Sequence, residues 1–303
     1  MSKLDYPRDM VGYGANPPNA NWPDGARLAL SFVINYEEGG ESCILHGDDR
    51  SETLLAQGIG EPPVMAGRDI EAESIFEYGS RAGFWRLMRL FAKFDFPVTF
   101  YAVGMALESN PDAARAMVEL GHEIATHGYR WVEYQHVSEA REREDIRRTI
   151  EVQQRVTGTR PVGYYGGRMS ANTRRLVVEE GGFLYDSDSY ADDLPYWDNN
   201  FDRPHLVIPY SLECNDWQFE TPAGFATGEA LCAHLKDAFD YLYGEGADTP
   251  KMMSVGLHCR LSGRPAMSAA LSRFLEHVAK HEDVWVCRRL DIARHWAEHH
   301  PAS

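Results

Sequence analysis

Polar and charged side chains occur at the ends of successive predicted strands of this chain. The first apolar run, which begins at Arg27, ends in Asn35, Glu37 and Glu38. The later runs end in or lead into His127, Tyr165, Arg168, Asp186, Asp188, Asp216, His258 and Arg260. Carboxylates and imidazoles can act as general bases and acids, and cationic or N–H donors can stabilise an oxyanion. These residue types therefore indicate an active site rather than a structural surface.

The elements that must position these residues alternate between short apolar runs and amphipathic segments. Strands are predicted at 27–35, 97–104, 122–128, 162–167, 183–189, 205–213, 252–258 and 284–288. Helices are predicted from about 80, from 111, over 138–156, after 172, over 228–243 and 266–280, and in a last segment ending near 300. This alternation favours parallel βαβ units, and about seven or eight of them favour a barrel. The carboxyl ends of the strands then meet at one rim, where we expect the site.

The fold class predicted is α/β, with a single catalytic barrel and few additions. Residues 1–26, rich in Pro, Gly and Asn, are expected to form an arm packed on the barrel, and residues 27–303 the barrel itself. Two long excursions, at about 38–78 and 188–204, interrupt the alternation. Loops of that length in a compact domain usually serve function, so we expect long loops over the carboxyl-end rim.

Charge and composition exclude several classes of partner. The chain carries 30 basic and 46 acidic residues, a net charge of −16, which repels nucleic acid and anionic lipid. No apolar run approaches the roughly 20 residues of a membrane span. The five cysteines are scattered without a CxxC pair, and the first residues have no apolar signal region. We therefore expect a cytoplasmic protein with reduced thiols and neither nucleic-acid nor membrane partners.

Each of these residues also has an ordinary structural explanation. The two glutamates after the first strand could begin a solvated loop, and either histidine could be a core residue with satisfied hydrogen bonds. Arg168 could pair with Asp186 or Asp188, and Asp216 could cap a turn. The joint occurrence of such residues at so many strand ends favours a shared site over these separate explanations.

Five segments carry a family resemblance that spans about residues 27–290. They read RLALSFVINYEEGG from Arg27, GHEIATHGYRW at 121–131, VGYYGGRMSANTRRL from Val162, NDW at 215–217 and SVGLHCRL from Ser254. In this order they resemble the motifs of the polysaccharide deacetylases (NodB-like, carbohydrate esterase family 4). The resemblance implies a distorted (β/α) barrel in which one Asp and two His hold a divalent metal, a second Asp is the base and the fifth-motif His is the acid.

The sequence departs from this family pattern where the metal would bind. The second histidine of the family's HxxxH pair is Trp131, and the first-motif aspartates are replaced by Asn35 and Glu37. Tyr165 stands at the family's third-motif Arg position, with Arg168 nearby. Stable metal sites usually need three or more protein ligands, so we predict no tightly bound catalytic metal and no other cofactor.

Longer phrases are similar to one branch of the family, the PuuE-type metal-independent allantoinases. These phrases are DYPRDMVGYG, NYEEGGE, EYGSRAG, HGYRW and RLSGRP. The resemblance implies a homotetrameric enzyme of purine catabolism. Such an enzyme hydrolyses a carbon–nitrogen bond in a cyclic amide, the hydantoin ring of allantoin, and yields allantoate without a metal.

The implied reaction assigns roles to the candidate catalytic residues. Glu37 is expected to be the general base, with Glu38 as the second candidate, and a shielded carboxylate at this strand end should have a raised pKa. His127 and Arg168 would polarise the ring carbonyl, and His258 would protonate the leaving nitrogen.

The remaining candidates are expected to bind the substrate. Trp131 would fill the space of the missing ligand and pack on the flat ring, and Asn35 would offer a donor and an acceptor to the ureide. Further binding residues are Glu38, Tyr165, Asp216 and Arg260.

Two other interpretations stay open. One is a metal-dependent deacetylase or amidohydrolase that acts on N-acetyl sugars or another cyclic imide. The presence of Trp131 argues against this enzyme, and an activity assay after chelation would distinguish it from a metal-independent allantoinase. The other is a pseudoenzyme that binds a ureide or a sugar. Close geometry of Glu37, His127 and His258 would argue against it.

Overall fold

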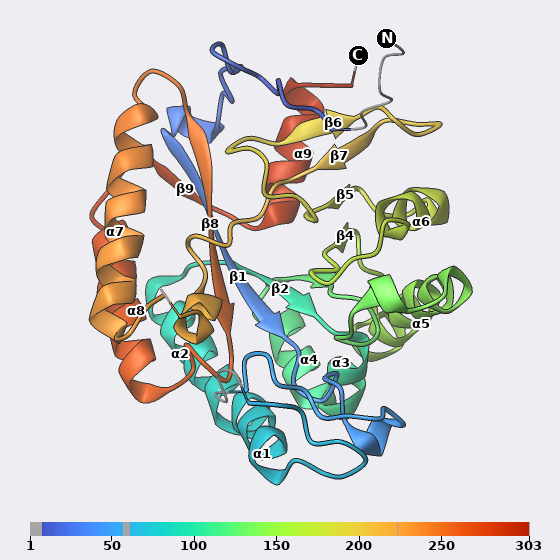
Figure 1. Ribbon diagram of the computed structural model, residues 1–303. Helices are drawn as coiled ribbons and strands as arrows, with labels where there is room; N and C mark the ends of the chain where they lie inside the picture. The colour runs from blue at the N-terminus through green and yellow to red at the C-terminus, as the bar shows by residue number, and fades with distance from the viewer. Residues whose placement is uncertain (1–7, 57–60, 223, 303) are drawn as a thin grey trace.

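A curled, mostly parallel sheet forms the centre of the molecule, a half-barrel with helices around it (Figure 1). The computed structural model describes residues 8–56, 61–222 and 224–302. Within them the strand order is β6-β7-β5-β4-β3-β2-β1-β8, and β9 pairs with the start of β1. Among the named strands of these described residues, β6 and β7 form the one antiparallel pair. The strands are β1 (Leu28–Tyr36), β2 (Val98–Ala102), β3 (Glu123–Thr126), β4 (Gly163–Tyr164), β5 (Tyr185–Asp186), β6 (Tyr196–Asp198), β7 (His205–Val207), β8 (Lys251–His258) and β9 (Val284–Val286). The predicted distorted barrel is confirmed.

The helices follow the predicted alternation, with additions inside the loops. They are α1 (Ile70–Tyr78), α2 (Phe84–Phe94), α3 (Gly104–Ser109), α4 (Pro111–Glu119), α5 (Glu139–Thr157), α6 (Thr173–Glu180), α7 (Gly228–Glu245), α8 (Pro265–Val278) and α9 (Arg289–His299). Ser138 caps α5 by accepting the Arg141 N–H, as its sequence position predicts. The prediction missed α1 and β6, which lie within the two long excursions, and the short α3. α3 and β6 are too short to show a periodicity, and α1 buries only Ala72 and Phe76, which leaves a weak apolar stripe.

The alternation of side chains along β1 separates the core from the site. Phe32, Ile34 and Tyr36 point outward into the main apolar cluster under the helices. Val33 points into the barrel, and Asn35 and then Glu37 follow on the same side because strand side chains repeat every two residues. The interior end of β1 therefore carries polar groups in a largely aromatic surrounding.

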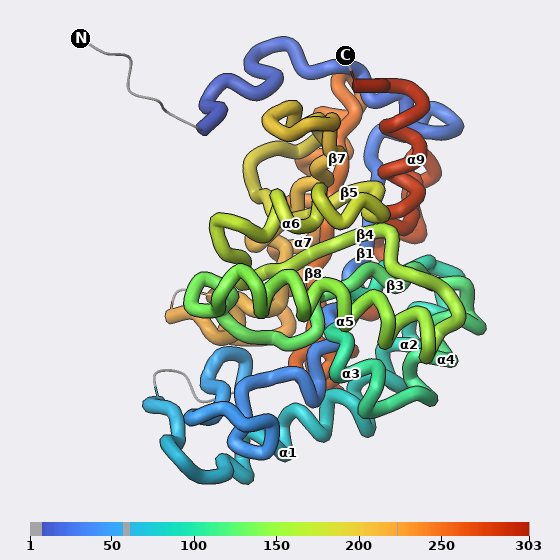
Figure 2. Tube along the Cα trace, turned by 90° about the vertical axis from the view of Figure 1, so that its right-hand side faces the viewer, coloured from blue at the N-terminus to red at the C-terminus, as the bar shows by residue number. Residues whose placement is uncertain are grey.

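The described part of the predicted arm, residues 8–26, packs at the end of the barrel that also carries the C-terminus (Figure 2). Trp22 is buried against Trp285 and Trp296 and donates from Nε1 to Lys251 O (2.8 Å). Residues 1–7 of that arm and residues 57–60 of the first excursion lie outside the described residues. The division of the chain at residue 26 stays a prediction.

No helix among the described residues combines the length and the apolarity needed to cross a membrane.

Candidate active site

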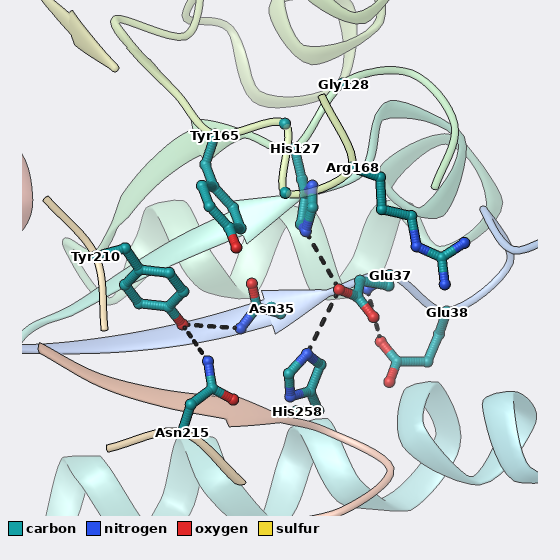
Figure 3. A network of polar contacts seen from close by, with 12 residues as sticks. Asn35, Glu37, Glu38, His127, Gly128, Tyr165, Arg168, Tyr210, Asn215 and His258 are labelled. Atoms are coloured by element: carbon teal, nitrogen blue, oxygen red, sulfur yellow. Dashed lines mark hydrogen bonds and ion pairs between the residues drawn. The ribbon is translucent and has the colours of Figure 1, made fainter. Parts of the chain in front are cut away.

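Glu37 lies at the centre of the predicted site residues. The turn after β1 positions it, because Gly40 donates its N–H to Glu37 O (2.8 Å) and any Cβ at Gly40 would collide with Val103. Glu37 Oε1 lies 3.2 Å from His127 Nε2 and 3.5 Å from His258 Nε2. Figure 3 shows the carboxylate between the two rings. The ends of β1, β3 and β8 thus bring a carboxylate and two imidazoles together.

A second layer of contacts fixes His258. Its Nδ1 lies 2.6 Å from Asp216 Oδ1, and its backbone N–H donates to Asp216 Oδ2 (2.8 Å). Ser262 Oγ also donates to Asp216 Oδ2 (2.6 Å). Burial disfavours the charged imidazolium, but the Glu37 and Asp216 carboxylates outweigh it and raise the pKa of His258 to about 9. His258 is therefore protonated at neutral pH, and its Nε2–H faces Glu37.

Arg260 supplies the buried cation beside the two glutamates. Its Nη2 donates to Glu37 Oε2 (2.6 Å), its Nη1 approaches Glu38 Oε1 (3.5 Å), and its Nε donates to Leu55 O (2.8 Å). The guanidinium is fully buried between the two carboxylates and the backbone of the first long loop. The Glu38 side chain points toward the segment at Gly79 and away from the barrel centre.

The pKa directions of the two glutamates differ from the expectation for Glu37. Burial opposes its ionisation, but Arg260 and His258 hold the pKa of Glu37 well below the usual value. Burial, with the Glu37 charge adding to it, raises the pKa of Glu38 to about 7 although Arg260 acts against this. The expected raised pKa therefore belongs to Glu38, because the cation that the sequence could not place lies closer to Glu37.

Trp131 and Arg168 form the side of the site that faces the first long excursion, at about 38–78. The Arg168 guanidinium lies 3.8 Å from the centroid of the Trp131 ring and donates to Glu52 Oε2 (2.8 Å). The alternative pairing of Arg168 with Asp186 or Asp188 is not the one found. A cavity of about 550 Å³ opens here, and its lining includes Arg168 and Glu52 but neither Glu37 nor the two histidines.

The two aspartates at the end of β5, Asp186 and Asp188, have structural partners. Asp186 accepts from Arg174 (2.8 Å) and lies 3.0 Å from His205 Nε2. Asp188 accepts the N–H groups of Gly166 and Gly167, which shapes the turn beside His127. They organise the rim and leave Glu37 as the central carboxylate.

Asn35 faces a hydroxyl and a tyrosine cluster that the sequence did not reveal. Its Nδ2 donates to Tyr210 Oη (3.1 Å) and to Leu257 O (3.2 Å), so both amide hydrogens are used and Oδ1 remains as an acceptor. Asn215 Nδ2 also donates to Tyr210 Oη (3.3 Å). Tyr165 packs 4.9 Å from the His127 ring. The hydrogen bonds that join Asn35, Tyr210 and Asn215 form the polar floor of the site (Figure 3).

Three residues with a place in this arrangement were missed as site residues. Tyr210 and Asn215 follow β7, and only the position of Asn215 in the NDW segment could have indicated it. Glu52 lies in an irregular loop, where no sequence signal pairs it with Arg168.

The donor set around Glu37 does not fit a tightly held divalent metal. Among the described residues, Glu37, His127 and His258 do not bring their ligand atoms close enough together to form a three-ligand group. Trp131 offers no ligand atom at the position of the family's second histidine, and Arg260 already places a positive charge on the carboxylate. The Arg260 guanidinium thus already neutralises the carboxylate to which a metal ion would have to bind.

Comparison with known proteins gives the family. A family model described as polysaccharide deacetylase matches residues 68–182. A putative polysaccharide deacetylase of Schizosaccharomyces pombe is 41% identical and covers 97% of this chain and 98% of its own length. The chain belongs to the polysaccharide deacetylase family. The family resemblance drawn from the sequence motifs is thereby confirmed.

Two solved structures extend the comparison of this family member. A probable polysaccharide deacetylase from Pseudomonas aeruginosa PAO1 is 57% identical, with a TM-score of 0.97 over 98% of this chain and 100% of that one. The structure of Puue allantoinase is also 57% identical, with a TM-score of 0.97 over 99% of this chain and 100% of that one. The similarity extends over the whole chain and is consistent with the PuuE-type branch.

Proposed function

We propose that this deacetylase-family hydrolase is an allantoinase that opens the hydantoin ring of allantoin without a metal. The observation that carries the proposal is the Glu37 carboxylate, held between two imidazoles and the Arg260 guanidinium. The full-length similarity to the structure of Puue allantoinase supports the choice of substrate.

The first step is the attack of water on the ring carbonyl. Glu37 accepts one proton of the water as its oxygen bonds to the carbonyl carbon. Geometry favours Glu37 over Glu38, because Glu37 faces both rings whereas Glu38 points away. His127 and Arg168 would stabilise the oxyanion, and a donor in such a dry site is worth a few kcal/mol, roughly 3.

The second step breaks the ring C–N bond. His258 Nε2–H protonates the departing ring N–H, which becomes the terminal NH₂ of a ureido group, and the carbonyl carbon becomes the new carboxyl group. The proton on Glu37 then returns to His258 across their 3.5 Å contact. The cycle consumes one water and restores both groups, and Asp216 acts only by orienting His258 and stabilising its charge.

Polar atoms that have no partner within the site can contact the substrate. Asn35 Oδ1 can accept a ureide N–H, because its own amide hydrogens are already bound. Trp131 contacts Arg168 with its ring face, so its role is to orient this guanidinium toward the cavity. Arg260 acts through the Glu37 carboxylate that it contacts, and Asp216 acts through the His258 ring.

The test is an assay of purified, exhaustively chelated protein with allantoin, hydantoin and an N-acetylated chitin oligomer. We expect turnover of allantoin at the same rate before and after chelation. Turnover of the chitin oligomer alone would overturn the choice of substrate. Allantoin binding without turnover would instead identify a pseudoenzyme.

A second candidate is a metal-dependent deacetylase, which the names of the relatives favour. Besides the yeast protein, a peptidoglycan deacetylase of Helicobacter pylori is 27% identical and covers 69% of this chain and 82% of its own length. Activity that chelation abolishes and zinc restores would support this candidate and reject a metal-free mechanism.

We further propose a cytoplasmic homotetramer, as the resemblance to PuuE-type enzymes implies. Size-exclusion chromatography with light scattering measures the mass of the protein in solution. A mass of 34.3 kDa, that of a single chain, would reject the tetramer.

A further inference from the structure

We propose that Asp240, His277 and His281 form a surface site for a transition-metal ion of the zinc class, separate from the active site. In the described residues, this is the group of three His, Cys, Asp or Glu side chains whose ligand atoms all lie within 4.8 Å of one another. Asp240 comes from α7, His277 from the last turn of α8, and His281 from the turn after it. An ion there would join the two helices that lie side by side in Figure 1.

The geometry of the two imidazoles prepares their Nε2 atoms for a metal. His277 Nε2 lies 2.6 Å from Asp240 Oδ1, so an ion that binds between them would replace the proton that they share. His281 Nδ1 lies 3.0 Å from His277 O, and because a carbonyl only accepts, this nitrogen must carry the hydrogen. The lone pair of His281 is then on Nε2. A ring N–H bound to a backbone carbonyl is the usual outer contact of a metal-binding histidine.

Aromatic packing holds both rings in place. The Phe239 ring meets the His277 ring edge-on at 5.5 Å and the His281 ring at 4.9 Å, and Tyr243 meets His281 at 4.9 Å. The Asp240 side chain is 52% exposed and that of His277 23%, so an ion can reach the site and keep a water ligand. The packing thus fixes both rings, and binding of an ion has to open only the contact between His277 and Asp240.

The ligand types select the metal. Two imidazole nitrogens and one carboxylate suit Zn²⁺, and also Co²⁺, Ni²⁺ and Cu²⁺, whereas Mg²⁺ and Ca²⁺ prefer all-oxygen sites. Three protein ligands and an open position give a site of moderate affinity.

The site lies at the opposite end of the barrel from Glu37. His281 precedes β9, which pairs with Leu28–Leu30 at the start of β1, whereas Glu37 follows the end of the same nine-residue strand. At ~3.3 Å per residue the strand separates the two ends by about 30 Å. Metal bound here should stabilise the α7–α8 pair and leave the ring-opening chemistry unchanged. Metal found in the purified protein would therefore say nothing about the active site until it is mapped.

The test is a calorimetric titration of untagged, chelator-stripped protein with ZnCl₂ in a weakly coordinating buffer at pH 7.5. We expect one equivalent to bind, a higher Tm with zinc, and a visible absorption band when Co²⁺ replaces it. His281→Ala and Asp240→Asn should each weaken binding at least ~10-fold and abolish the rise in Tm. His299→Ala is the matched control, because His295 and His299 form another i, i+4 histidine pair (4.3 Å between rings) outside the three-ligand group.

Three results would overturn the proposal. They are the lack of saturable zinc binding, equal binding by the control and the two site variants, and loss of zinc binding in Glu37→Gln with the site variants unaffected. The first would leave Asp240 and His277 as a simple ion pair, and the last would place the metal in the barrel.

Discussion

The contact between Asp216 and His258 makes the alkaline limb of the pH profile sensitive to one substitution. The pKa of His258 rises from an ordinary 6.5 to about 9. At 1.36 kcal/mol per pKa unit, this corresponds to roughly 3 kcal/mol in favour of the imidazolium. Two carboxylates supply this stabilisation against the opposing effect of burial, so removal of the Asp216 charge should remove a large part of it.

Asp216→Asn keeps the size of the side chain and an oxygen that can accept from His258 Nδ1–H. We expect the pH at which kcat/KM for allantoin declines on the alkaline side to shift down from near 9 by roughly one to two pH units. The acid form of His258 is the active one and is lost as pH rises through its pKa. The variant should therefore lose about 2-fold to 10-fold in kcat/KM at pH 8 and much less at pH 6.

The assay is initial-rate kinetics from pH 5 to 10 on chelated protein, with circular dichroism at each pH. Asp240→Asn is the matched control, because Asp240 Oδ1 and His277 Nε2 lie at the same 2.6 Å but at the far end of the barrel. An Asp216→Asn profile that is lower at every pH but parallel to the wild type would refute the reasoning. The carboxylate would then have no effect on the proton affinity of the acid.

Further predictions concern the two glutamates and their cation. Glu37→Gln should lower kcat at least ~100-fold with the fold intact by circular dichroism, since an amide cannot accept the proton of the water. With Glu37 as the base, the acid limb of kcat/KM should lie below pH 4.5, because its pKa is lowered from that value, whereas a limb near pH 7 would assign the base to Glu38. Arg260→Met leaves both buried carboxylates without their cation and should lower the free energy of unfolding by about 3–5 kcal/mol. An unchanged urea midpoint would show that the contact between Arg260 and the two glutamates contributes no net stability.

Two features of the fold and the site were readable from the sequence because they depend on local order. Apolar runs that alternate with amphipathic helices predict parallel strands, and parallel strands place their carboxyl ends at one rim. Glu37, His127 and His258 follow or end such strands, and the structure brings them within 3.5 Å contacts. Ser138 marks the start of α5 through local backbone chemistry, and it could be predicted for the same reason.

The partners of these residues depended on the tertiary structure. Nothing in the sequence joins Arg260 to Glu37, or Glu52 to Arg168, because these pairs form between segments far apart along the chain. The pKa of a buried carboxylate depends on which charge lies nearest in a region of low polarity, and so the raised value falls on Glu38 and not on its neighbour. The sequence by itself determined which groups stand at the rim, and the folded chain decided their protonation, because Coulomb interactions depend on distance in space and not on separation along the chain.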